Sequence, residues 1–282
     1  MGQQPAVPAA ARAAAEAACG SPVELTEITD RRGSAVWKAT GPSGRAAAIK
    51  VGYGDGLPVT AREGEVLRLL GRPDLLGAGT AAEASWIVTR WLDGPSTYKL
   101  FAPYRGGEDG QEQALTAAVG LCRAVADLHA AGWMHSDLQP AHALHTPAGV
   151  QLIDLAWAWR PGFEPTDAFG GGIVHLLAPE LAASINVGIT PVTPSPAADV
   201  YALAGSLWTC VTGRWPLDYQ AAGIDRHQLS PAQLRARIAN RAAPLSPARP
   251  WPELQKPLLD VLLAPRDNRP TAPELGDLIA SL

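Results

Sequence analysis

The pattern of apolar residues changes once along this chain of 282 residues, at the turn-forming sequence Asp93-Gly94-Pro95. Before that point, apolar and polar residues alternate in short segments, which predicts β-strands. The segments are VELTEI (23–28), SAVWKAT (34–40), RAAAIKV (45–51) and SWIVTRWL (85–92). After it, apolar residues recur at helical spacing and predict a helix over residues 112–131 that ends at Gly132. The expected fold is α+β, with a strand-rich part before a larger, mainly helical part.

The composition excludes several classes of protein. Hydrophobic residues make up 47% of the chain and charged residues 18%, as in a globular protein. A net charge of −4 gives no general attraction to nucleic acid or to an anionic membrane, so neither is expected as a partner. The three cysteines lie far apart, which argues against a disulfide framework and a structural zinc site. The longest apolar run, 200–211, is too short to span a bilayer and predicts a buried helix, so the expected location is cytoplasmic.

The expected organisation has three parts. Residues 1–22 form an N-terminal extension or a short helix, residues 23–94 a small strand-rich lobe, and residues 95–282 a larger helical lobe. Within the small lobe, residues 60–70 are expected to be helical, with Val66, Leu67 and Leu70 on one side. Thr60 followed by Glu63 matches a capping box at the start of this helix.

The first residues with chemical potential are Lys50 and Glu63. Lys50 ends the predicted strand RAAAIK, from which its ammonium group can reach the phosphates of a nucleotide. A carboxylate on the following helix would hold that ammonium group in place. Glu63 fits better than Glu65, because Val66 and Leu67 follow it at the spacing of a helix that packs beside the strand. The alternative is a lysine on an edge strand with a solvated glutamate.

Two aspartates follow in the helical part. Asp137, in the segment H135-S-D-L-Q-P-A-H142, comes directly after the long predicted helix and could take or orient a hydroxyl proton. Asp154 ends the apolar segment VQLID and could bind a Mg²⁺ ion that bridges phosphates. For each aspartate the alternative is a turn-capping role.

These segments, taken in order, resemble the successive signatures of protein kinases. The matching sequences are AAAIK, HSDLQPAH, LIDLA, LAPE, ADVYALAGSLWTCVTGRWP and RDNRPT, and they extend over nearly the whole chain from residue 23. Each is weak alone, but six in the family's order are specific. The resemblance implies a two-lobed kinase-like fold that binds ATP and Mg²⁺ between its lobes.

The resemblance also implies roles for single residues. Lys50 and Glu63 would pair, Asp137 would be the catalytic aspartate and Asp154 the metal ligand. Glu180 would pair with Arg269, and Asp199 would tie a central helix to the catalytic loop, all without touching substrate. The backbone of Arg90 to Leu92 would bind adenine, with Trp86, Thr89 and Trp91 nearby.

The chain departs from the family in the parts that contact phosphate and metal. The phosphate-binding loop, residues 29–36, has one glycine where three are usual, so Gly33 and Ser34 would be helped by the side chains of Arg31 and Arg32. Ser136 replaces an arginine that pairs with a phosphorylated loop in the family. Activation is therefore expected not to need loop phosphorylation, with Thr166 an ordinary loop residue.

Two further departures lie in the catalytic loop. Gln139 replaces a lysine and is expected to face the phosphates without its charge. His142 replaces an asparagine that binds metal in the family. Imidazole suits Mg²⁺ poorly, so either the second metal site is altered in favour of Mn²⁺, or His142 bonds to Asp137 or to a phosphate. The Asp-Phe-Gly triplet reads Asp154-Leu155-Ala156, so the glycine hinge is absent.

The function expected from these features is ATP-dependent phosphorylation of Ser or Thr in a peptide or protein. The Gln-Pro-x-His variant is similar to that of the kinase-type proteins in lanthipeptide and thioamitide pathways, where a separate lyase partner eliminates the phosphate from a precursor peptide. The alternatives are a pseudokinase that serves as a binding module and a small-molecule kinase. A metal-dependent hydrolase built on His135, Asp137, His142 and His145 would leave Lys50 without a role.

Overall fold

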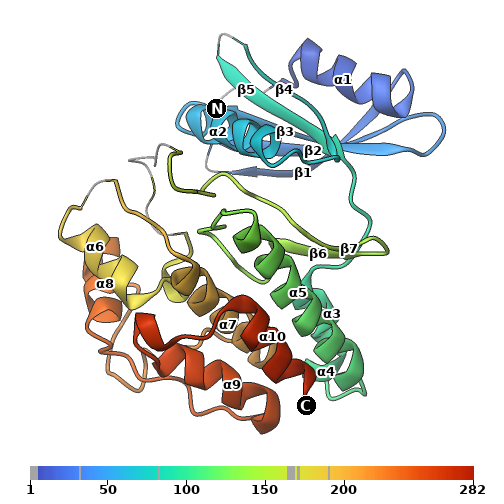
Figure 1. Cartoon of the computed structure of the whole chain (residues 1–282). Helices are drawn as coiled ribbons and strands as arrows, with labels where there is room; N and C mark the ends of the chain where they lie inside the picture. Colours follow the sequence, from blue (N-terminus) through green and yellow to red (C-terminus); the bar gives the residue numbers. More distant parts are fainter. Residues whose placement is uncertain (1–5, 32, 82, 164–168, 170–171, 190) are drawn as a thin grey trace. The chain divides into compact units, whose positions relative to one another are not determined.

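The structure is a computed structural model that describes residues 6–31, 33–81, 83–163, 169, 172–189 and 191–282 (Figure 1). Two compact units make up the chain. The first comprises Met1–Leu92 together with Asp154–Trp157, and the second comprises Asp93–Ile153 together with Ala158–Leu282. In the part of the chain that the structure describes, no helix combines the length and the apolar character that crossing a bilayer requires.

The first unit is built on an antiparallel sheet with the strand order β1-β2-β3-β5-β4. Its strands are β1 (Glu24–Arg31), β2 (Ser34–Thr40), β3 (Ala46–Tyr53), β4 (Leu75–Ala81) and β5 (Ala84–Arg90). The four segments predicted as strands correspond to β1, β2, β3 and β5. Along β3, Ile49 and Val51 are fully buried while Lys50 between them is directed to the other side of the sheet, as the two-residue repeat of a strand requires.

Two helices pack on the sheet of the first unit. Helix α1 (Ala9–Cys19) buries Ala11, Ala15 and Cys19 in a core that also contains Ile49 and Val51. Helix α2 (Gly56–Leu69) packs against β3, β4 and β5. Residues 1–22 therefore include a helix that is part of the core of this unit.

The predicted capping box at Thr60 is wrong. Helix α2 begins four residues earlier, at Gly56, and Thr60 lies inside it with only 1% of its surface exposed. The backbone of Gly52 on β3 comes so close that a Cβ atom there would lie 2.3 Å from the Thr60 hydroxyl oxygen. Thr60 is thus a packing residue, and its place in the helix interior was hidden by the Gly-Leu-Pro sequence that starts the helix.

Trp86 also lies elsewhere than predicted. It packs with the core that α1 covers, and its indole lies against Gly77 and Gly79 of β4. Trp86 pairs across the strands with Val51, whereas Lys50 pairs with Ile87. Because neighbouring residues of a strand alternate between faces, Trp86 is on the face opposite Lys50 and not beside a nucleotide held there.

The second unit is mainly helical. Its long central helices are α5 (Gln111–Ala130) and α7 (Pro196–Thr212), as the apolar spacing predicts. Helix α7 is buried on nearly all sides, starts at the N-cap Ser195 and ends at Gly213, whose φ of 69° suits glycine. The other elements are α3 (Thr97–Leu100), α4 (Ala102–Arg105), β6 (Ala143–Thr146), β7 (Gly149–Leu152), η1 (Val174–Leu176), α6 (Pro179–Asn186), α8 (Pro231–Ala239), α9 (Pro252–Leu263), η2 (Arg266–Asn268) and α10 (Ala272–Ala280).

Candidate active site

In the first unit, Lys50 stands between two carboxylates. Its Nζ atom donates to Glu63 Oε2 at 2.6 Å and to Asp154 Oδ1 at 2.8 Å. Glu63 comes from α2, while Asp154 comes from the short segment that joins this unit from far along the chain. The predicted pairing of Lys50 with Glu63 is thus present, and Asp154 is added to it. Glu65, the rival candidate, does not take this place.

Electrostatics fix the charge of this cluster. Burial by itself would lower the pKa of Lys50, but the charges of Glu63 and Asp154, with their hydrogen bonds, outweigh it and raise the pKa. Burial raises the pKa of Glu63, and the ammonium group of Lys50 acts against that change. The Leu155 backbone N–H donates to Glu63 Oε1 at 3.3 Å. Lys50 therefore stays cationic at neutral pH and can face phosphate as a fixed charge.

Asp154 has an unusual backbone. Its φ of 60° lies in the left-handed region, which an aspartate occupies at an energetic cost. The strand β7 ends before it, at Leu152, so the chain turns sharply here and directs the carboxylate toward Lys50. The side chain remains 39% exposed. An aspartate held in this way can bind a cation at its exposed side.

In the second unit, Asp199 at the start of α7 holds the loop that carries Asp137. Its carboxylate accepts from the backbone N–H of His135 at 2.6 Å and of Ser136 at 2.9 Å. His129 donates to the same carboxylate at 3.0 Å. The predicted tie between Asp199 and the catalytic loop is therefore present. Ser136 has a φ of 68°, so this loop too contains a left-handed residue next to its aspartate.

His135 is fully buried and positions the backbone around it. Its Nε2 bonds to the Ile153 carbonyl at 3.1 Å, so Nε2 must carry the proton. Its Nδ1 accepts from the Asp137 N–H at 3.3 Å. Both ring nitrogens are thus occupied by backbone groups. His135 is a positioning residue, which removes the first member of the hydrolase alternative.

Gln139 and His142 both lie against Asp137. Gln139 Nε2 donates to Asp137 Oδ2 at 3.4 Å, and His142 Nδ1 donates to the Asp137 carbonyl at 2.9 Å. The distance from His142 Nδ1 to Asp137 Oδ2 is 3.8 Å. This contact matches the second of the two alternatives for His142, a bond to Asp137. The fourth residue of the hydrolase alternative, His145, instead bonds through Nε2 to Thr97 at 2.8 Å.

Gly172, in the segment that follows residue 171, lies directly against the side chain of Asp137. Its φ is 64°, and a Cβ atom built on it would lie 2.3 Å from Asp137 Oδ1. Only glycine can therefore occupy this position while Asp137 keeps its place.

Among the residues that the structure describes, no group of three or more His, Cys, Asp or Glu side chains could by itself hold a metal ion.

Comparison with known proteins finds relatives that are named as protein kinases. No protein-family model matches the chain. A protein of Thermomonospora curvata described as a probable serine/threonine-protein kinase, PkwA, is 28% identical over 260 residues, which is 88% of this chain and 32% of that protein. The serine/threonine-protein kinase PknK of Mycobacterium tuberculosis is 29% identical over 189 residues, 63% of this chain and 16% of PknK. The chain thus spans about a third or less of the relatives it matches.

The chain is therefore similar to proteins named serine/threonine-protein kinases, and its strand-rich and helical units are consistent with a two-lobed kinase-like fold. A purely structural ion pair of the kinase-like fold is also in place. Arg269 donates to both oxygens of Glu180, at 2.6 and 2.8 Å, and to the Ala197 carbonyl at 3.0 Å. Such a bidentate pair fixes the geometry of both side chains, here joining the start of α6 to the segment before α10.

The loop before β2 is the segment from which phosphate binding is expected. Gly33 has a φ of 73°, its carbonyl accepts from the Tyr53 N–H at 2.8 Å, and a Cβ atom would lie 2.9 Å from the Gly56 N atom. Glycine is thus required at this position because the backbone packs closely against β3 and α2. The Ser34 hydroxyl oxygen is buried and has no hydrogen-bond partner among the described residues. Arg31 is exposed, while Arg32 and Thr166 lie outside the described residues.

The segment expected to bind adenine retains one backbone donor. The Arg90 N–H donates to the Asp74 carbonyl at 2.8 Å, and the Trp91 N–H donates to the Ala46 carbonyl at 3.0 Å. Both are therefore used inside the first unit. Among the described residues, none accepts from the Leu92 N–H.

Sequence reasoning missed three contributors to this kinase-like site. Gly172 had a possible signal, since it belongs to a run of three glycines at 170–172. His129 follows the buried residues Cys122 and Val125 of α5 at helical spacing and is itself mostly buried, but this spacing gave no signal of its contact with Asp199. The left-handed backbone of Asp154 had no signal either, because it depends on where β7 ends.

Proposed function

We propose that this chain is an ATP-dependent phosphotransferase that acts on Ser or Thr hydroxyl groups of a peptide or protein. The observation that carries the proposal is the Lys50 ammonium group held between Glu63 and Asp154. A half-buried ammonium group that two carboxylates keep charged is suited to an anionic ligand, and phosphoryl transfer requires phosphates to be positioned in this way. PkwA and PknK carry the name of serine/threonine-protein kinases, which supports the same activity.

In this proposal Lys50 holds the α- and β-phosphates, and Asp154 binds the divalent cation. The donor set fits: Mg²⁺ binds through one or two carboxylates together with substrate phosphates, and the Asp154 carboxylate is 39% exposed. When bound, the cation would neutralise negative charge on the phosphates. The backbone of Leu92 is the remaining donor for adenine, and the Arg90 carbonyl is the candidate acceptor. Gly33 and Ser34 would contribute little, since both are engaged or enclosed.

Asp137 accepts or orients the proton of the attacking hydroxyl group. Asp199 and His135 fix its backbone, and Gln139 donates to its side chain. His142 has its Nδ1 on the Asp137 carbonyl, so it steadies this loop and leaves metal binding mainly to Asp154.

We propose further that the acceptor is a ribosomally made precursor peptide and that a separate lyase then removes the phosphate. The support is the sequence variant Gln139-Pro140-Ala141-His142 together with the single-glycine loop. All three cysteines are free and buried, which suits a reducing, ATP-containing cytoplasm.

A phosphorylation assay tests the activity. The chain is incubated with ATP, Mg²⁺ or Mn²⁺ and a Ser/Thr-containing precursor peptide, and phosphate gain is measured by mass spectrometry. Asp137→Asn and Asp154→Asn should each lower the rate by about 10²–10⁴-fold. Asp277→Asn, an exposed aspartate on α10, is the matched control and should leave the rate unchanged. Equal rates in all four proteins would overturn the assignment.

A pseudokinase is the second candidate, favoured by one observation. Gly33 is turned into the packing of β3 and α2, so the loop offers phosphate few backbone N–H groups. Thermal-shift titration with ATP separates the two functions, because a ligand that binds the folded state raises the melting temperature. A rise with Mg²⁺ or Mn²⁺ that Lys50→Met abolishes supports the phosphotransferase. No response in either metal favours the binding module.

A further inference from the structure

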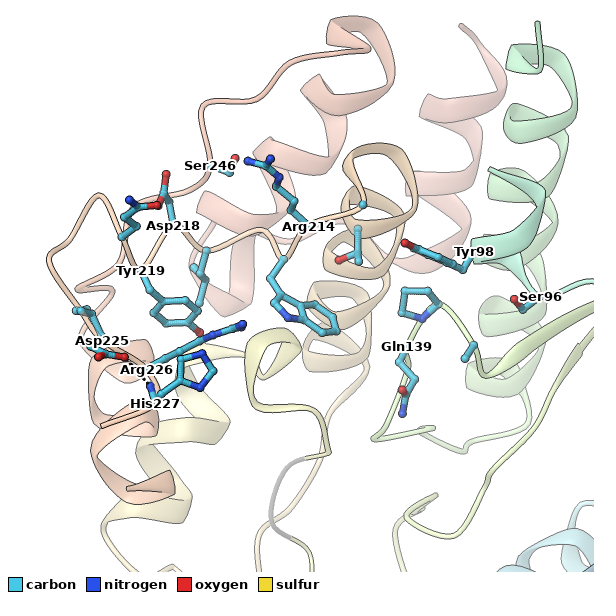
Figure 2. A pocket seen from close by; sticks show the side chains of 18 of the residues that line it. Ser96, Tyr98, Gln139, Arg214, Asp218, Tyr219, Asp225, Arg226, His227 and Ser246 are labelled. Atoms are coloured by element: carbon cyan, nitrogen blue, oxygen red, sulfur yellow. Dashed lines mark hydrogen bonds between the residues drawn. The ribbon is translucent and has the colours of Figure 1, made fainter. Parts of the chain in front are cut away.

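A large cavity opens in the second unit beside the loop that carries Asp137 (Figure 2). Its volume is about 950 Å³, at the upper end of what a small-molecule site offers. Gln139 lines the cavity and also donates to Asp137 Oδ2, so the cavity starts one side chain away from the catalytic aspartate. Figure 2 shows it extending from Tyr98 and Gln139 past Arg214 to Tyr219 and Arg226.

Three cations line this cavity: Lys99, Arg214 and Arg226. They come from different segments, Lys99 from α3 and the two arginines from the stretch between α7 and α8. Lys99 and Arg214 are exposed and Arg226 is half-buried. None of the three forms a salt bridge or a side-chain hydrogen bond within the part of the chain that the structure describes. Their charges are therefore available to a ligand.

Two carboxylates also line the cavity, and both are occupied with the local backbone. Asp218 Oδ1 accepts from the Ala221 N–H, and Asp225 Oδ1 accepts from the His227 N–H, each at 3.0 Å. These bonds shape the loop that carries Arg226. With three cations against two such carboxylates the lining has an excess of positive charge, whereas the chain as a whole carries −4. The positive character is thus local to this cavity.

Trp215 and Tyr219 line the same cavity as Arg226, and both contact His175, which is neutral. The Tyr219 hydroxyl bonds to His175 Nδ1 at 2.9 Å, and the His175 ring lies 5.1 Å from the Trp215 ring. Burial, followed by the charge of Arg226, lowers the pKa of His175 to about 4. His175 is therefore uncharged at neutral pH and neither adds to nor offsets the three cations.

We propose that this cavity selects acceptor peptides that carry acidic residues close to the Ser or Thr to be phosphorylated, with Lys99, Arg214 and Arg226 as the specificity-determining residues. The proposal rests on the phosphotransferase function above, because it assumes that the peptide residues on either side of the phosphorylated Ser or Thr bind in this cavity. Carboxylates of the peptide would accept hydrogen bonds from the arginines, whose guanidinium groups can donate to both oxygens of one carboxylate. Opposite charges at such a site guide association and register.

The test compares three synthetic peptides that share a central serine and differ in their flanking residues: Glu, Gln or Lys. The full chain should phosphorylate the Glu peptide with a kcat/KM about tenfold above that of the Gln peptide and further above that of the Lys peptide, mainly through KM. In Arg214→Gln/Arg226→Gln the ratio of Glu to Gln peptide should fall about tenfold. Arg123→Gln, an exposed arginine of α5 outside the cavity, is the control and should keep the wild-type ratio. High salt should reduce the preference.

Binding of fluorescent versions of the same peptides, measured by anisotropy without ATP, separates this proposal from the phosphotransferase function. Tighter binding of the Glu peptide that the double variant loses supports the selective cavity, even if no peptide gains phosphate. Equal binding of the Glu and Gln peptides, or an equal loss in Arg123→Gln, overturns it. A preference for the Lys peptide would overturn it as well.

Discussion

The tightest constraint at the scale of single residues is the approach of Gly172 to Asp137. The two residues are 35 positions apart in the sequence, yet a single added methyl group would reach the carboxylate at 2.3 Å. A Cβ contact under 3.0 Å forces something to move, and Asp137 Oδ1 is the atom in the way. The position of the proposed catalytic aspartate therefore depends on the absence of a side chain at residue 172.

Gly172→Ala should lower kcat roughly tenfold or more, because displacing a catalytic group by about 1 Å can cost 10²-fold. Gly188→Ala is the matched control, since Gly188 also has a positive φ, 74°, but has open space where the Cβ atom would lie. Both variants carry the backbone strain of a positive φ, so the comparison isolates the contact with Asp137. The measurement is kcat for the peptide substrate at saturating ATP. A similar kcat in the two variants would contradict the prediction.

For single residues, the sequence predicted ion pairs correctly. Lys50 with Glu63 and Glu180 with Arg269 were predicted as pairs, and both are present. Prediction failed where backbone conformation decides the outcome, as at Asp154 with its φ of 60°. Such angles depend on how neighbouring elements end, which a local pattern of residue types does not encode.

At the scale of elements, η1 is joined to the loop after α7 by a half-buried histidine. His175 bonds to Tyr219 and contacts Trp215, and burial with the nearby Arg226 lowers its pKa to about 4. An unfolded histidine titrates near 6.5, so the unfolded chain binds a proton in a range where the folded chain does not. The contribution of His175 to stability is therefore complete above pH 6.5 and is lost progressively as the pH falls toward 4.

His175→Asn should accordingly flatten the dependence of unfolding free energy on pH between about 6.5 and 4. Asparagine keeps a polar group near the position of Nδ1 but does not titrate. The measurement is urea unfolding at a series of pH values. Data at pH 8, where the imidazole is neutral in both states, isolate the loss of packing from the loss of titration. An unchanged slope between pH 6.5 and 4 would show that His175 does not contribute to it.

In the first unit, sequence reasoning missed the strand β4. Its sequence, LLGAGTA, contains two glycines and little β-branched character, so its intrinsic preference for a strand is weak. The structure gives the reason: the indole of Trp86 lies over Gly77 and Gly79, and a Cβ atom on Gly79 would come within 2.9 Å of it. Packing against Trp86 thus requires glycine in this strand, and these glycines make the strand hard to predict from residue propensities.

At the scale of the whole molecule, α1 is a structural part of the first unit. Ala15 is fully buried against the sheet, whereas Ala13 on the same helix is exposed. Ala15→Glu should lower the melting temperature by at least about 5 °C, because it places a charge in an apolar core. Ala13→Glu is the matched control and should change it little. Differential scanning fluorimetry measures both, and equal melting temperatures would show that α1 does not hold the unit together.

The order of the motifs predicted the fold of the molecule, and helices and strands follow the predicted change of pattern near residue 93. The division into units could not be read from that order. Asp154–Trp157 lies far along the chain but packs with the first unit, because its contacts are with Lys50 and Glu63. Such long-range membership depends on side-chain contacts that are not local in the sequence.

The place of α1 has a practical consequence for anyone who works with this protein or its relatives. Motif searches set the start of a kinase-like domain at its first strand, here at residue 23 or 24. A gene fragment cut there would encode every catalytic candidate and yet leave Ile49, Val51 and Trp37 facing water where α1 had covered them. Such a fragment would give an aggregating, inactive protein, and the failure would be misread as a missing activity.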